Sequence, residues 1–308
     1  MKIAIIGTGG VGGYYGGLLA YQGEEVTFLA RGAHLEAIRE HGLQIKSIHG
    51  DVHIVPAKAT DDPKQIGQID LALFCVKTYD TEQLAQEIIP ILGNNTVVLS
   101  LQNGIDAAER IGRTVGMKHM LAGATWISSA VEAPGVIRQV SQFRRMVLGE
   151  LNGSLTPRLR AIYTAFQNTG ITVEMTEDIQ KVLWTKFVFI SAASSVGSLT
   201  RLPIGDYRSV PETRSLIILL MKEVEAVARA QGVALDVDVV EKSLDFVDQV
   251  APQIKASMQI DVELGRRSEI ESMIGVIGRK GRLASIATPV ADMIYAALLP
   301  VDLKRRSA

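Results

Sequence analysis

A glycine-rich turn placed directly after the first apolar segment restricts the fold of this chain more than any other feature. Residues 2–6 form a short run with β-branched side chains, which is typical of a buried parallel strand. The pattern G-x-G-x-x-G follows at once, in Gly7, Thr8, Gly9, Gly10, Val11 and Gly12. Residues 10–20 then favour a helix and residues 25–30 a second strand. This order predicts one β-α-β unit with the glycine turn at its first corner.

Each glycine of the turn has a physical role in such a unit. The first allows the tight turn, the second lets the backbone approach a pyrophosphate, and the third lets the helix pack closely on the strand. The N-terminus of the helix adds N–H groups and a positive dipole that attract phosphate. The turn therefore predicts a dinucleotide site; the alternative is a glycine-rich turn that binds no ligand.

Further strands and helices alternate along the first half of the chain. Strand composition recurs in residues 69–76, 96–101 and 171–175. Asp80 and Gln83 match a capping box that would open a helix to about residue 92. Residues 42–56 indicate a hairpin around a His-Gly-Asp turn. This alternation predicts an α/β fold with a Rossmann-type, doubly wound and mostly parallel sheet.

From about residue 176 onward, helical periodicity replaces the strand signals. An apolar segment over residues 179–196 follows an acidic cap, and Pro211 begins a further helix that ends before Gly232. Ser268 and Glu271 match a second capping box, for a helix that ends in a basic turn followed by a glycine at 281. These signals predict helices and no strands.

Length and composition fit two domains and exclude several function classes. At about 100–200 residues per domain, 308 residues suggest roughly two domains, which we place at 1–175 (Rossmann-type, nucleotide-binding) and 176–308 (all-helical). A net charge of −1 without a basic stripe argues against nucleic acid as a ligand. A single cysteine, Cys75, excludes an intramolecular disulfide, and the histidine spacing predicts no metal site. No targeting segment and no apolar stretch of about 18 residues is visible, so we expect a cytoplasmic protein without a membrane span.

The end of the second strand indicates which nicotinamide cofactor the turn would bind. An NAD site usually places an acidic residue here for the ribose 2′-hydroxyl, whereas this chain has Ala30 and Arg31. An arginine pairs with a 2′-phosphate, which an acidic residue would repel. We therefore predict NADP(H); the alternative is that Arg31 is a solvated surface charge.

A lysine interrupts the apolar face of the first helix in the second domain. That face consists of Ile179, Val182, Leu183, Phe187 and Ile190, and Lys186 falls inside it. Burial of an ammonium group is costly and lowers its pKa, which suits a proton donor near neutrality. The alternative is a lysine whose charged end reaches water.

Taken together, these motifs resemble the ketopantoate reductase (2-dehydropantoate 2-reductase) family over essentially the whole chain. The residues that carry the resemblance are the glycine turn, Arg31, Val76-Lys77, Gln102-Asn103-Gly104, Pro134-Gly135, Leu183-Trp184-Thr185-Lys186 and the segment from Ser257 to Glu269. It implies an NADPH-dependent enzyme that reduces 2-dehydropantoate (ketopantoate) to pantoate, in which a hydride goes to the 2-oxo carbon.

The resemblance also implies a role for each matching residue. Lys186 would protonate the 2-oxo oxygen, and Asn103 would lie between nicotinamide and substrate. Lys77 would lie on the cofactor side, Ser257 would bind the substrate carboxylate, and Glu269 would lie beside the nicotinamide ribose. Pattern alone leaves other interpretations open, since Asn103 also marks a turn, Lys77 a solvated strand end, and Glu269 a helix-dipole partner.

One departure bears on the substrate. Ile190 and Ser194 stand where related reductases have asparagines that bind the substrate hydroxyl, and isoleucine can neither donate nor accept a hydrogen bond. A more apolar 2-oxo acid is therefore an alternative to ketopantoate. A dehydrogenase of the 3-hydroxyacid or 6-phosphogluconate type and a non-catalytic NADP(H)-binding sensor are further alternatives. The apolar helices of the second domain are also compatible with a homodimer.

Overall fold

The structure, a computed structural model, describes residues 1–306 and divides into two compact units. The first comprises Met1–Gln102 and Asp106–Ile179. The second comprises the chain from Gln180 onward together with the three residues Asn103–Ile105, which lie far away in the sequence. The first unit is built on a mostly parallel sheet and the second on helices, so the predicted fold class is confirmed.

An eight-stranded sheet with the order β12-β11-β8-β7-β6-β1-β2-β5 forms the centre of the first unit. Its strands are β1 (Lys2–Ile6), β2 (Glu25–Leu29), β5 (Lys58–Thr60), β6 (Ile69–Phe74), β7 (Leu92–Ser100), β8 (Met120–Trp126), β11 (Arg145–Gly149) and β12 (Thr172–Met175). Neighbouring strands are parallel except for the antiparallel pair β8 and β11. After β1, the strands β2 and β5 lie on one side of it, whereas β6 and the later strands lie on its other side. The boundary between β1 and β6 is therefore a topological switch point, which is where open α/β sheets bind ligands.

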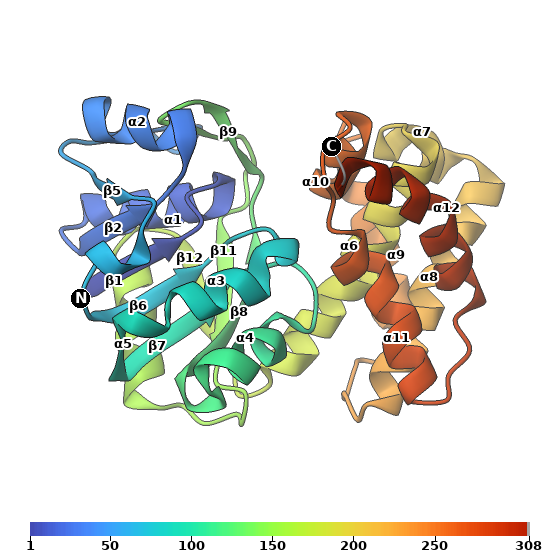
Figure 1. Ribbon diagram of the computed structural model, residues 1–308. Coiled ribbons are helices and arrows are strands. Elements are labelled where there is room, and N and C mark those ends of the chain that lie inside the picture. The colour runs from blue at the N-terminus through green and yellow to red at the C-terminus, as the bar shows by residue number, and fades with distance from the viewer. Residues whose placement is uncertain (307–308) are drawn as a thin grey trace. The chain divides into compact units, whose positions relative to one another are not determined.

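Helices cover both faces of this sheet because successive residues of a strand point to opposite sides. The helices are α1 (Gly10–Tyr21), α2 (Gly32–His41), α3 (Thr81–Glu87), α4 (Ala107–Val115) and α5 (Pro157–Gln167), shown in Figure 1. In β1, Ile3 and Ile5 belong to the core that contains residues of α1, α2 and α5. Ala4 and Ile6 belong to a second core with residues of α3 and α4.

A second, four-stranded sheet, ordered β4-β3-β10-β9, packs against α1. It consists of β3 (Leu43–Ser47), β4 (Val52–Ile54), β9 (Ser129–Ala133) and β10 (Val136–Gln139). The antiparallel pair β3 and β4 confirms the predicted hairpin, whereas its pairing with β10 was not predicted. Glycines let α1 approach this sheet, since a Cβ atom on Gly17 would lie 2.5 Å from Ile45.

The N-cap position predicted at Asp80 is confirmed, but neither predicted capping box forms its hydrogen bonds. Asp80 does occupy the N-cap position of α3, but its side chain makes no capping hydrogen bond, and α3 ends at Glu87 because Pro90 follows. Ser268 donates its hydroxyl to Asp302 instead of capping a helix, and Glu271 begins a π-helical turn.

Apart from the segment Asn103–Ile105, the described part of the second unit is built on helices. They are α6 (Ile179–Thr200), α7 (Ile204–Ser209), α8 (Pro211–Ala230), α9 (Val239–Gln249), α10 (Ser257–Glu263), α11 (Val276–Leu283) and α12 (Pro289–Arg306), with the π-helical turn Glu271–Gly275 before α11. No strand occurs among residues 176–306. Helix α8 packs against α9, α11 and α12 (Figure 1). The last strand ends at Met175, and α11 extends two residues past the predicted glycine stop.

Helix α6 is also long and apolar enough to cross a membrane by length and composition, which corrects the expectation that no segment reaches this length. Its most apolar 18-residue window is 61% buried inside the protein. Trp184, Phe187 and Val188 of α6 belong to the core of the helical unit. The core helices of soluble proteins pass the same test, so α6 is weak evidence for a membrane span.

Candidate functional site

The glycine turn between β1 and α1 has the geometry that a dinucleotide site requires. Gly7 has φ +98°, and a Cβ atom on it would lie 2.7 Å from the side chain of Val76, at the end of β6. A Cβ atom on Gly12 would lie 2.2 Å from the carbonyl oxygen of Gly7, and one on Gly10 would lie 2.2 Å from that of Ser129. These three positions therefore exclude any side chain.

Gly9 differs from its neighbours because a Cβ atom there would meet nothing within 4 Å. The turn beside it is fixed by Thr8, whose N–H and hydroxyl both donate to the carbonyl oxygen of Leu29, over 3.1 and 2.9 Å. Val11 packs against the core behind the turn. The open backbone at Gly9, at the N-terminus of α1, fits the phosphates of a dinucleotide such as NAD(P)H.

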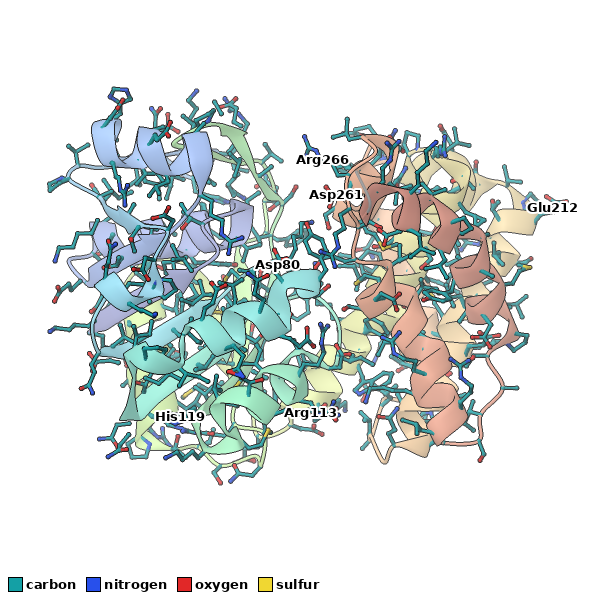
Figure 2. All side chains as sticks on the ribbon, viewed as in Figure 1. Asp80, Arg113, His119, Glu212, Asp261 and Arg266 are labelled. Atoms are coloured by element: carbon teal, nitrogen blue, oxygen red, sulfur yellow. The ribbon has the colours of Figure 1, made fainter. Side chains whose placement is uncertain are left out.

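Arg31 and Lys77 follow neighbouring strands of the same sheet. Arg31 comes after β2 and before α2; its side chain is 59% exposed, and its Nη2 lies 3.8 Å from a carboxylate oxygen of Glu87. Lys77 follows β6, is partly buried, and precedes the short turn that ends at Asp80, labelled in Figure 2. Because β1, β2 and β6 are parallel, their carboxyl ends lie at one edge of the sheet, so both cations belong to the edge that carries the glycine turn.

Lys186 contacts a residue from a distant part of the sequence. Its Nζ atom donates a hydrogen bond of 2.8 Å to Oδ1 of Asn103, which follows β7 and precedes a tight turn at Gly104, φ +105°. Burial lowers the pKa of Lys186 from 10.5 to about 8, while the negative charge of Glu269 opposes this shift. Glu269 is itself only 7% exposed. The structure thus brings Lys186, Asn103 and Glu269 together within the helical unit.

Ile190 and Ser194 lie one and two turns after Lys186 on α6, which places them on the same face of the helix. Ile190 packs against the apolar core of the helical unit, and Ser194 is 2% exposed. Ser257 is the exposed first residue of α10. Within residues 1–306, no hydrogen bond joins its side chain to Lys186, Asn103 or Glu269.

Gln102 belongs to the motif that carries the family resemblance, but its structural role was not predicted. It is 7% exposed, and its Nε2 atom donates to the carbonyl oxygen of Val76 and to the hydroxyl of Thr81, both over 2.9 Å. It therefore ties the end of β7 to the loop after β6. The available signal was a polar side chain at the end of an apolar strand.

Comparison with known proteins places the whole chain in one family. The family model described as ketopantoate reductase PanE/ApbA matches residues 3–153, and its C-terminal counterpart matches residues 178–302. The uncharacterized oxidoreductase YkpB of Bacillus subtilis is 32% identical over 97% of this chain and 98% of its own length.

Solved structures agree with this assignment. The 2-dehydropantoate 2-reductase of Geobacter metallireducens has a TM-score of 0.92 at 31% identity, covering 97% of this chain and 99% of that one. A D-mandelate dehydrogenase solved with NADH and anilino(oxo)acetate has a TM-score of 0.90 at 23% identity, covering 99% of this chain and 100% of that one. At this identity the second likeness shows the fold alone.

Proposed function

Because the chain belongs to the ketopantoate reductase PanE/ApbA family, whose members are NAD(P)H-dependent oxidoreductases, we propose that it reduces 2-dehydropantoate to pantoate with NADPH. The observation that carries the proposal is the partly buried ammonium group of Lys186, which is hydrogen-bonded to Asn103 and interacts electrostatically with Glu269. A cytoplasmic location and a homodimer stay predictions.

Lys186 is the proton donor in this proposal. With a pKa of about 8, it is mostly protonated at neutral pH yet gives up its proton more readily than an ordinary lysine. An ammonium group has three N–H donors, of which Asn103 accepts one, and in this proposal the 2-oxo oxygen of the bound substrate accepts another. The positive charge also stabilises the negative charge that develops on that oxygen. NADPH, when bound, supplies the hydride.

We assign the cofactor to the edge of the sheet that carries the glycine turn. The backbone around Gly9 would hold the phosphates, and Arg31 would pair with the 2′-phosphate that distinguishes NADPH from NADH. The exposure of Arg31 and its distant partner Glu87 leave its guanidinium accessible. Lys77, Asn103 and Glu269 complete the proposed cofactor contacts. Substitution of Arg31 by alanine then weakens the binding of NADPH and leaves that of NADH unchanged.

The substrate class is supported more firmly than the particular substrate. Lys186 and Asn103 suit any 2-oxo acid, and we assign its carboxylate to Ser257. Ile190 favours a second candidate, a 2-oxo acid whose side chain lacks a hydroxyl group, because an isoleucine offers such a group no hydrogen-bond partner. The buried Ser194 would supply the remaining polar group on that helix face.

The experiment compares two substrates that differ only in that hydroxyl. Oxidation of NADPH is followed with ketopantoate and with trimethylpyruvate, which has the same carbon skeleton without the hydroxyl group. Faster turnover of ketopantoate, lost in Lys186→Ala, would support the proposal. Preference for trimethylpyruvate would favour the second candidate. NADPH binding without turnover of any 2-oxo acid would instead favour a sensor.

A further inference from the structure

We propose that α12 positions the carboxylate of Glu269 through two anchors, one on each side of it in the sequence, and so sets the charge that acts on Lys186. The first anchor joins Ser268 to Asp302, and the second joins Glu271 to Tyr295. Asp302 and Tyr295 are seven residues apart on α12, or about two turns, and therefore lie on the same face of this helix. The inference rests on the proposed role of Lys186.

The first anchor is a buried carboxylate that accepts two hydrogen bonds from one residue. Oδ1 of Asp302 accepts the backbone N–H of Ser268 over 2.9 Å and its hydroxyl over 2.8 Å. Asp302 is 3% exposed and Ser268 is 4% exposed. Loss of either partner would leave a polar group buried without its bond, so this contact fixes the backbone immediately before Glu269.

The second anchor holds the π-helical turn Glu271–Gly275. Oε1 of Glu271 accepts the hydroxyl of Tyr295 over 2.8 Å, and Oε2 accepts Nη1 of Arg279, also over 2.8 Å. Nη2 of Arg279 donates to the backbone carbonyl of Glu271 over 2.7 Å. A Cβ atom on Gly275 would lie 2.8 Å from the ring of Tyr295, so the packing requires glycine there. π-Helical turns are rare and often occur at functional sites.

Glu269 lies between these anchors with its backbone fixed on both sides. Its carbonyl oxygen accepts the N–H groups of Ser272 and Met273 over 3.1 and 3.0 Å, which ties it to the π-helical turn. Its side chain is buried, so few orientations are open to the carboxylate. The contacts of α12 therefore determine where the carboxylate of Glu269 lies.

That charge acts on Lys186. Burial lowers the pKa of Lys186, and the negative charge of Glu269 opposes this effect. Asn103, which accepts a hydrogen bond from Lys186, is neutral. If an anchor is loosened, the carboxylate moves away and the ammonium group loses a favourable interaction. The pKa of Lys186 then falls further below that of an ordinary lysine, and fewer molecules carry the proton at a given pH.

The test measures the pKa of Lys186 without relying on turnover. The rate at which an amine-reactive reagent acylates Lys186 is followed by mass spectrometry as a function of pH. Tyr295→Phe removes only the anchoring hydroxyl, and Tyr207→Phe is the matched control, because that buried hydroxyl donates to Ala193 in the same unit. Glu271→Ala breaks the second anchor, whereas Glu271→Gln keeps an oxygen that Tyr295 can bond.

We expect Tyr295→Phe and Glu271→Ala to shift the acylation midpoint to lower pH, in the same direction as Glu269→Gln. Glu271→Gln and Tyr207→Phe keep the wild-type midpoint. With a reducible 2-oxo acid, kcat of Tyr295→Phe at neutral pH falls about twofold while KM changes little, because a smaller fraction of Lys186 is protonated.

Two results separate this inference from the proposed function. A midpoint that moves in Glu269→Gln but not in Tyr295→Phe or Glu271→Ala would overturn the positioning role of α12, whatever the substrate. Shifted midpoints in a protein that reduces no 2-oxo acid would support the anchors and refute the proposed reaction. Circular dichroism of each variant confirms that it is folded before either result is scored.

Discussion

Lys186 donates its hydrogen bond to Asn103 over 2.8 Å, although 83 residues separate the two in the chain. The contact explains why the short segment Asn103–Ile105 groups with the helices while Gln102 and Asp106 on either side group with the sheet. Ile105, in the same segment, is buried in the core of the helical unit. The segment thus joins the helical unit through a polar contact of Asn103 and through the burial of Ile105.

Removal of the lysine tests its chemical role. Lys186→Ala should abolish the reduction of the 2-oxo acid and leave the affinity for NADPH largely intact, since the glycine turn that we assign to the phosphates belongs to the other unit. Turnover is measured by NADPH oxidation and affinity by the change in NADPH fluorescence on binding. Loss of both would show that Lys186 is a structural residue.

The pH dependence of turnover should report the same residue. A proton donor acts only in its protonated form, so kcat falls as pH rises through the pKa of Lys186, which burial lowers to about 8. At neutral pH, below this pKa, most molecules carry the proton and kcat is close to its maximum. The check is a kcat profile with saturating NADPH and substrate. A profile that stays flat up to 10.5, the ordinary lysine pKa, would contradict the assignment.

The fold was predictable where the chain order and the local pattern agree. The first β-α-β unit follows from residues 2–30 because the strand, turn and helix are consecutive. The strands β8 to β11 gave no such signal; β10 pairs with β3, about 90 residues earlier, and β11 runs antiparallel to β8 in a mostly parallel sheet. These pairings depend on tertiary packing, which periodicity does not contain.

The site was predictable to a similar degree. Lys186 was identified because a charge inside an apolar helix face is conspicuous, whereas its partner Asn103 follows from the family resemblance. The capping box at Ser268 failed because a competing acceptor, Asp302, lies 34 residues later in the chain. Local spacing cannot reveal such a partner, and for the same reason the anchors around Glu269 were not foreseen.

A substitution in the glycine turn should weaken cofactor binding without affecting folding. Alanine at Gly9 meets no atom within 4 Å and has an ordinary extended backbone, so Gly9→Ala should keep the thermal stability of the protein. If the cofactor backbone approaches at this point, the added methyl group raises the Kd for NADPH at least tenfold, about 1.4 kcal/mol.

The matched control for this variant is Gly93→Ala on β7, where the nearest heavy atom to a new Cβ would be 3.6 Å away. It should change neither the melting temperature nor the affinity for NADPH. Differential scanning fluorimetry and isothermal titration calorimetry give the two quantities. Equal NADPH affinities in the two variants would mean that the phosphates do not lie on the glycine turn.

The last prediction concerns Ile190, the position at which we expect this chain to depart from related reductases. Ile190→Asn restores a donor and an acceptor one turn after Lys186, so it should raise the ratio of kcat/KM for ketopantoate to that for trimethylpyruvate at least tenfold. Ile190→Leu is the control, because it keeps the volume and adds no polar group. Steady-state kinetics with both substrates gives the ratio for each variant. An unchanged ratio in Ile190→Asn would show that this position does not contact the part of the substrate that carries the hydroxyl group, and the choice between the two substrates would then lie with other residues.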